Sequence, residues 1–203
     1  MHRACVAFRV KLRRDTGTDL AAADCELLLG VAFTCEGGEE VTLQINPGRF
    51  YECLGQAIAR HAIALGLPDY EKVAWWCYRE AAGVHTHPGG MRRLAGCLFI
   101  GQGVTPDPVQ AVAWYQKAAD MGDVASKARL GGFLVEGEAR AGVAKDAAPG
   151  FVLLREAVDQ GHGMALYHVA ECYLTGEGVG KDAERGVSLL RQVINNQEDA
   201  IKA

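Results

Sequence analysis

A short glycine motif recurs along this chain, and it constrains the fold more than any other feature of the sequence. The motif reads Gly-x-Gly-Val-x-x-Asp, followed four residues later by alanine or glycine, and its clearest copies span residues 101–111 and 176–186. A weaker copy covers residues 142–146, and a degenerate copy covers residues 66–70. The apolar anchors of the four copies lie 37, 39 and 36 residues apart, at Leu67, Val104, Val143 and Val179. A period of this length predicts an array of repeats, which more often presents a binding surface than a catalytic site.

Apolar spacing before each motif predicts a first helix in every repeat. Pairs of mostly apolar residues four positions apart form one helix stripe. The stripe is expected to end at Gly101, Gly137 and Gly176, because glycine readily adopts the left-handed conformation that closes a helix. In the third copy, the apolar pair aligns with the pairs of the other copies only if three extra residues are allowed before Gly142. The pairs are Ala57 and His61, Leu94 and Leu98, Leu130 and Leu134, and Val169 and Tyr173.

A second helix is predicted after each motif. Asp107, Asp146 and Asp182 are placed to cap it, since a carboxylate can accept hydrogen bonds from the free amides of the first turn. One of the adjacent Trp75 and Trp76 is expected to pack in the core. The residues expected to be buried on the second helices are Ala74, Cys77, Tyr78, Ala81 and Ala82; Ala111, Trp114, Tyr115, Ala118 and Ala119; Leu153, Leu154, Ala157 and Val158; and Leu189, Leu190, Val193 and Ile194.

Together these residues resemble the Sel1-like repeat family, whose helical hairpins are related to tetratricopeptide repeats. The resemblance rests on Leu130-Gly131, on residues 111–122 and on residues 173–182, and it covers residues 50–197, between an amino-terminal segment of residues 1–49 and a tail of residues 198–203. The first copy departs from the pattern, since Tyr70 stands where a capping Asp is expected and Ala64 where a glycine is expected. The resemblance implies an all-α, right-handed α-solenoid of about four hairpins. It also implies a scaffold for protein complexes, and no catalytic residues.

Composition favours a soluble protein of a reducing intracellular compartment. The 203 residues suffice to bury a core, 49% of them are hydrophobic, and the net charge of -4 gives no reason to expect nucleic acid as a partner. No apolar run is long enough to span a bilayer. The seven cysteines form no CxxC pair and follow no repeat spacing, which favours free buried thiols over disulfides. We therefore expect a cytoplasmic protein.

Residues 1–49 follow the repeat pattern poorly. Alternating apolar residues predict short strands at residues 6–12 and 41–45, and the apolar residues 27–33 fit a helix, a strand or a degenerate repeat helix. Five Lys and Arg residues precede the first acid, and seven Asp and Glu residues then follow without a Lys or Arg among them. These charge blocks either neutralise each other or bind separate partners. An acid-free, arginine-rich start is also typical of a mitochondrial targeting peptide, which makes the mitochondrion the alternative location.

Two histidines and two Gly-x-Gly pairs are of residue types found in metal and cofactor sites, but their spacing does not fit such a site. His85 and His87, with Cys77 or His61 nearby, lack the four-ligand spacing of a structural zinc site, and a polar turn explains them better. The Gly-x-Gly pairs follow predicted helices, whereas a dinucleotide-binding motif follows a strand. We therefore expect no metal, no cofactor and no enzymatic activity.

The register of the first helices predicts a binding site. The first residue of each stripe pair is preceded directly by one column of residues, which comprises Gln56, Arg93, Arg129 and His168. A second column lies three positions after the first and comprises Ala59, Gly96, Gly132 and Glu171. Both columns point away from the buried stripe and would line a groove on the concave side of a solenoid. Because guanidinium can hold a carboxylate with two hydrogen bonds, the expected ligand is a peptide with acidic side chains or a terminal carboxylate. The predicted site comprises Arg93, Arg129, Glu136, His168 and Glu171, and the alternative is an ordinary solvated helix face.

The function that the sequence favours is a protein-interaction scaffold or adaptor. One alternative is a permanently bound architectural subunit of a large complex, for which the sorted charges before residue 41 are the cue. Another is a regulatory or enzymatic protein, although no nucleophile, base and orienting group occur at a recognisable spacing.

Overall fold

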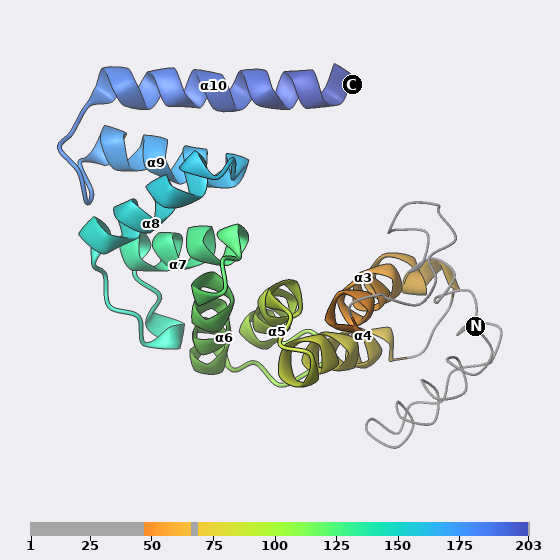
Figure 1. The fold of residues 1–203 in the computed structure, drawn as a ribbon. Coiled ribbons are helices and arrows are strands. Elements are labelled where there is room, and N and C mark those ends of the chain that lie inside the picture. The colour runs from red at the N-terminus through yellow and green to blue at the C-terminus, as the bar shows by residue number, and fades with distance from the viewer. Residues whose placement is uncertain (1–46, 66–68, 203) are drawn as a thin grey trace. The chain divides into compact units, whose positions relative to one another are not determined.

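The computed structural model describes residues 47–65 and 69–202, whose regular structure is helical apart from one isolated bridge. The strands predicted at residues 6–12 and 41–45 lie outside the described residues. Internal contacts divide the chain into two compact units, residues 1–114 and 115–203 (Figure 1). The α-helices of the described residues are α3 (Pro47–Leu65), α4 (Tyr70–Arg79), α5 (Pro88–Ile100), α6 (Pro108–Asp120), α7 (Val124–Glu136), α8 (Ala147–Asp159), α9 (Gly163–Thr175) and α10 (Ala183–Lys202).

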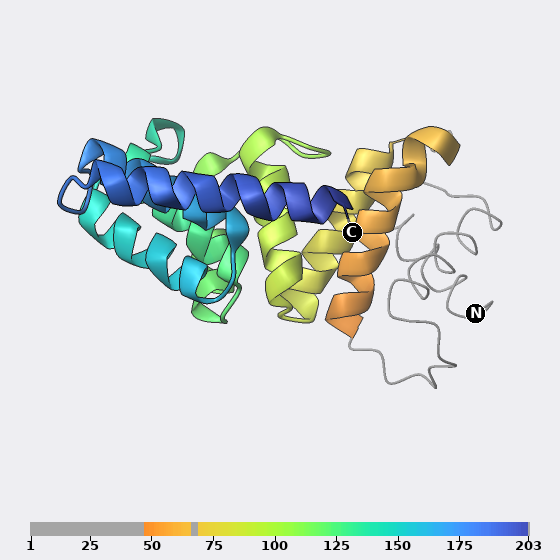
Figure 2. The ribbon, with the colours of Figure 1, turned by 90° about the horizontal axis from the view of Figure 1, so that it is seen from above.

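In three of the predicted hairpins the two helices pack against each other. In the first unit α3 packs against α4, which continues into a π-helical turn at Glu80–Val84. In the second unit α7 packs against α8 and α9 against α10, and α8 also contacts α9 (Figures 1 and 2). A short 3-10 turn, Ala139–Ala141, lies between α7 and α8.

In the three repeats after the first, a glycine ends the first helix. Gly101 and Gly176 have φ angles of 84° and 85° and close α5 and α9, and Gly137, with φ of 78°, closes α7. This φ range is one that residues with a side chain rarely adopt, and the three helix ends lie at the predicted residues. Gly101 and Gly176 are left-handed as predicted, whereas Gly137, with ψ of 138°, is not.

The second glycine of the motif has a different role, which the sequence did not indicate. A Cβ atom added at Gly103 would collide with the backbone of Glu71 at the start of α4. A Cβ atom at Gly178 would likewise collide with the backbone of Ala147 at the start of α8. The motif therefore brings two stretches of main chain into direct contact, one from each of two successive hairpins.

The motif aspartates start the second helices. Asp107 accepts a hydrogen bond from the Gln110 amide at 2.9 Å, and Asp182 accepts one from the Arg185 amide at 2.9 Å, as predicted. The prediction is wrong for Asp146, whose side chain makes no capping hydrogen bond although α8 begins at the next residue. All three aspartates also share a backbone role, since their amides donate at 2.8 Å to the carbonyls of Leu98, Leu134 and Tyr173 on the preceding first helices.

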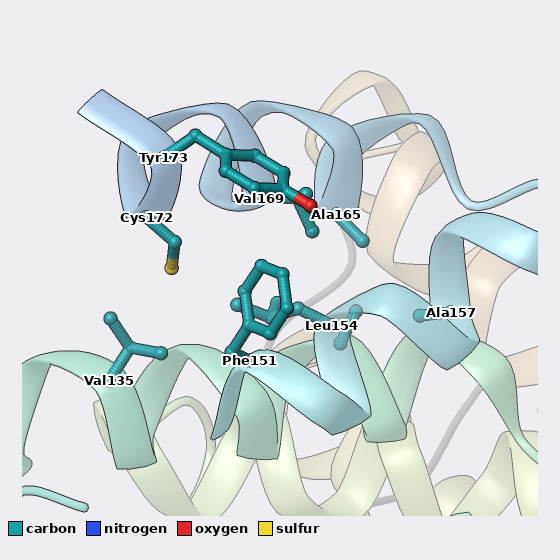
Figure 3. Packing of buried hydrophobic residues seen from close by; sticks show 9 residues of the cluster. Val135, Phe151, Leu154, Ala157, Ala165, Val169, Cys172 and Tyr173 are labelled. Carbon is teal, nitrogen blue, oxygen red and sulfur yellow. The ribbon is translucent and has the colours of Figure 1, made fainter. Parts of the chain in front are cut away.

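The predicted first-helix stripe forms much of the core. Its buried members are Ala57, Leu94, Leu98, Leu130, Val169 and Tyr173. In the second unit the ring of Phe151 on α8 meets the ring of Tyr173 on α9 edge to face, with centroids 5.5 Å apart (Figure 3). Leu154 and Ala157 extend this contact along α8 and are fully buried. Apolar contact between neighbouring hairpins is therefore continuous within this unit.

The second-helix stripe is buried in part. Trp76 is fully buried in the first unit and is the core tryptophan, whereas Trp75 is half-buried beneath the guanidinium of Arg79. Several predictions of burial need correction: Ile194 on α10 is 55% exposed, and the following residues are only half-buried: Trp114, Leu153, Val158, Leu189, Leu190 and Val193. In the internal helix α8, which packs against α9, Leu154 and Ala157 of the stripe are fully buried.

Candidate functional site

Three of the predicted site residues come together in the second unit. Nδ1 of His168 on α9 lies 3.5 Å from a carboxylate oxygen of Glu171, one turn further along the same helix. It also lies 3.8 Å from Oε1 of Glu136 at the end of α7. Two carboxylates from two first helices therefore flank one imidazole.

Exposed apolar side chains adjoin this cluster on α9. Met164 is 70% exposed and Tyr167 is 43% exposed, and they share one helix face with His168 and Glu171 at the spacing i, i+3, i+4 and i+7. A hydrogen bond with Glu171 raises the pKa of the Tyr167 hydroxyl, and the rings of Tyr167 and His168 lie 5.6 Å apart. Sequence reasoning did not include Met164 and Tyr167 in the site, although this helical spacing was a signal that could have found them.

The third element of the face is the middle of α7. Arg129 is exposed there, two turns before Glu136, and Gly132 lies between them. A Cβ atom added at Gly132 would meet no atom within 4 Å, so the surface above this glycine is open. We call the surface formed by these residues the α7–α9 face; it comprises Arg129, Gly132, Glu136, Met164, Tyr167, His168 and Glu171.

Arg93 differs from Arg129 in its surroundings. It lies on α5 in the first unit, where its Nε atom is 3.9 Å from Oε1 of Glu52 on α3. That Nε atom is buried and has no hydrogen-bond partner in the described part of the chain, while the whole side chain is 39% exposed. Its charge is therefore engaged within the first unit, in contrast to the open position of Arg129.

Glu52 is the centre of a polar cluster that sequence reasoning missed. It is 8% exposed, and its carboxylate accepts a hydrogen bond from Gln56 at 2.9 Å and lies 3.6 Å from Nη2 of Arg92. The side chain fits against α5 because Gly89 has no Cβ atom to displace it. The sequence signal was an acidic residue on the first helix four positions before Gln56, which becomes informative only when α3 and α5 are known to be neighbours.

His85 and His87 both have structural roles in the first unit. His87 precedes α5, and its Nδ1 atom accepts a hydrogen bond from the Gly90 amide at 3.2 Å. His85 stacks on the ring of Tyr51, with centroids 5.4 Å apart and planes 14° from parallel. Within the described residues, no group of three His, Cys, Asp or Glu side chains is placed to hold a metal ion.

Comparison with known families identifies the repeat. The Sel1 repeat model matches residues 88–123, 124–162 and 163–195, which together make up more than half of the chain. The chain belongs to the Sel1 repeat family. Its three matched Sel1 repeats begin at α5, α7 and α9, and proteins of this family generally act in protein–protein interaction, typically as non-catalytic scaffolds.

Solved structures show the same Sel1 fold. A Sel1 repeat protein from Oxalobacter formigenes is 21% identical, with a TM-score of 0.61 over 84% of this chain and 72% of that one. The protein c5321, described as a protective antigen of uropathogenic Escherichia coli strains with an SLR fold, is 20% identical, with a TM-score of 0.62 over 97% of this chain and 46% of that one. A search of curated protein sequences finds no match. The fold that the sequence predicts, an all-helical Sel1-like solenoid, is confirmed.

None of the helices in residues 47–65 and 69–202 combines the length and the apolar character needed to cross a bilayer. The thiols of Cys77, Cys97 and Cys172 are buried, and burial raises the pKa of Cys97 and of Cys172 to about 11. Thiols held in the protonated form are poor nucleophiles, so these cysteines contribute to packing.

Proposed function

We propose that this protein is an interaction scaffold that binds an extended segment of a partner protein on the α7–α9 face. The observation that carries the proposal is the exposed pair Met164 and Tyr167, which lies directly beside the His168 cluster. Exposed methionine and tyrosine side chains supply apolar contact area, and tyrosine is enriched where binding energy is concentrated.

The charged residues of the α7–α9 face determine the orientation of the bound segment. Arg129 is suited to a carboxylate of the partner, because its guanidinium is exposed and can form two parallel hydrogen bonds. Glu136 and Glu171, two turns further along the face, are suited to a basic group. The partner segment would therefore carry an acidic group near Arg129 and a basic group near Glu171, with an apolar side chain between them.

Gly132 contributes room for the bound segment. Because a Cβ atom at this position would contact nothing, the partner main chain can approach α7 closely there. Gly132→Leu should therefore block binding by occupying this space, while the helix itself tolerates leucine well.

The experiment compares proteins that co-purify with the wild-type chain and with three variants. Tyr167→Ala, Glu171→Lys and Arg129→Ala should each reduce capture of the same partner, with unchanged melting curves, because all three side chains are exposed or partly exposed. Val152→Ala on α8 is the matched control, since Val152 is exposed on a different helix and is predicted to leave capture unchanged. Full capture by the Tyr167→Ala, Glu171→Lys double variant would contradict the proposal.

Salt dependence separates a scaffold from a permanent subunit. An exchanging partner held by Arg129 and Glu171 should be released as salt rises, because exposed ion pairs are screened within about 8 Å at physiological ionic strength. A stoichiometric partner that survives high salt would indicate a permanently bound subunit instead.

A further inference from the structure

The last helix of the second unit leaves exposed a stripe that the internal hairpins bury. On α8 the stripe begins with Phe151, five residues after Asp146, and α9 covers it through Tyr173. The equivalent position on α10, five residues after Asp182, is Val187, which is 43% exposed. Among the helices of the second unit, α10 packs against α9 on its other side.

The exposed stripe of α10 has the spacing of a coiled-coil seam. Its members are Ala183, Val187, Leu190 and Ile194, at intervals of four, three and four residues. Ile194 is 55% exposed and Leu190 is half-buried, so the stripe is available along three turns of the helix. Figures 1 and 2 show α10 as a long straight helix that extends beyond α9.

Two charges flank one edge of the stripe. Glu184 and Arg191 are both exposed and lie seven residues apart on the same side of the seam. Together with Ala183, Val187 and Ser188 they line a shallow hollow on this helix.

We propose that this stripe binds a second copy of the same chain, with the two α10 helices antiparallel around a two-fold axis. In this arrangement Val187 packs against Leu190 of the second copy, and Ala183 packs against Ile194 of the second copy. In an antiparallel two-helix interface, residues on one flank of the apolar stripe face residues on the same flank of the second helix. Glu184 therefore lies beside Arg191 of the second copy, and the two-fold axis repeats this pair on the other end.

The charges select this arrangement over a parallel one. A parallel seam would place Arg191 beside Gly186 of the second copy, with no acid to meet it. The antiparallel register buries the apolar stripe and at the same time pairs Glu184 and Arg191 with opposite charges. A second copy of the chain is thus complementary to α10 in apolar spacing and charge.

The test is the oligomeric state of the chain, measured by sedimentation velocity over a concentration series from roughly micromolar to hundreds of micromolar. We expect a dimer whose fraction rises with concentration. Glu184→Arg and Arg191→Glu should each raise the dissociation constant by about tenfold, since each replaces two attractive pairs by repulsive ones. The double variant Glu184→Arg, Arg191→Glu should restore the wild-type value, because it exchanges the two charges across the axis.

Two further variants complete the design. Val187→Asp should abolish the dimer by placing a charge in the centre of the seam. Gln192→Glu is the control, because Gln192 is exposed on the side of α10 away from the seam, and it should leave the dissociation constant unchanged. A wild-type chain that is monomeric throughout the series would overturn the proposal, as would a dimer that resists both Val187→Asp and the single charge reversals. Circular dichroism of each variant verifies that α10 remains folded.

Discussion

Glu52 Oε2 lies 3.4 Å from Nδ1 of His87, across the junction between α3 and α5. The same nitrogen accepts a hydrogen bond from the Gly90 amide, so it carries no proton while it caps α5. The Glu52 carboxylate therefore has its positive partners in Arg92 and Arg93. His87 acts as a helix cap in this junction, and the two arginines balance the charge.

Arg93→Ala should destabilise the first unit by about 1 kcal/mol, because it removes a partner of a mostly buried carboxylate that Arg92 still balances in part. Arg129→Ala should change the unfolding free energy by less than about 0.5 kcal/mol, as expected for an exposed side chain. Urea titrations of both variants measure the difference. Equal stability of the two variants would contradict the charge-balancing role of Arg93.

Gly178→Ala should cost roughly 2 to 4 kcal/mol, since it adds a collision with the Ala147 backbone to the strain of a positive φ angle. Gly142→Ala is the matched control, because Gly142 also has a positive φ, 67°, but a Cβ atom there meets nothing within 4 Å. It should cost only about 1 kcal/mol. Thermal melts of the two variants compare the costs, and similar losses would show that the close backbone approach contributes nothing.

His162→Asp should stabilise the second unit by about 0.5 to 1 kcal/mol. His162 caps α9 through Nδ1, which accepts from the Ala165 amide at 3.2 Å, whereas Asp123 caps α7 with a shorter bond of 2.9 Å to the Ser126 amide. A carboxylate also interacts favourably with the positive end of the helix. Slower hydrogen exchange in the first turn of α9 would support this prediction, and faster exchange would refute it.

The buried thiols should make the protein sensitive to alkali. Burial raises the pKa of Cys97 and of Cys172 from an ordinary value of 9.0 to about 11, so between these values the unfolded chain loses protons that the folded chain retains. Stability should be fully present below pH 9 and fall as the pH rises from about 9 to about 11.

The Cys97→Ala variant checks the alkaline prediction, because it removes one of the three buried thiols and should make the fall in melting temperature over that pH range less steep. Thiol titration provides a second measurement. The folded chain should react slowly at Cys97 and Cys172 near neutral pH, and fast labelling of both without unfolding would contradict their burial.

The helical hairpins were predictable because their signals are local. The helix ends at Gly101 and Gly176 and the caps at Asp107 and Asp182 depend on residues a few positions apart, and the structure confirms each of them. The prediction for Asp146 was wrong because cap residues were inferred by alignment, and the side chain at that position makes no capping hydrogen bond.

Features that depend on contact between hairpins were harder to predict. The pairing of Glu52 with Arg93 requires α3 and α5 to be adjacent, and the role of Gly178 requires knowledge of where α8 begins. In the candidate site, the structure places His168 close to Glu136 and Glu171. The register did not distinguish the engaged Arg93 from the exposed Arg129, because identical positions in successive repeats have different neighbours.

The extra residues between α7 and α8 are closed off from the rest of the repeat. Glu138 and Val143 exchange two backbone hydrogen bonds of 3.0 Å, which pinch the intervening turn into a small loop. After this loop the Asp146 amide still donates to the Leu134 carbonyl. The amides of Asp107 and Asp182 donate to the equivalent carbonyls in the hairpins without the insertion. Chain length can thus vary at this point while the joint between the two helices is preserved. The tip of this loop is a natural position for grafting a recognition peptide or a fluorescent label, which would leave the α7–α9 face and α10 unaltered for binding measurements.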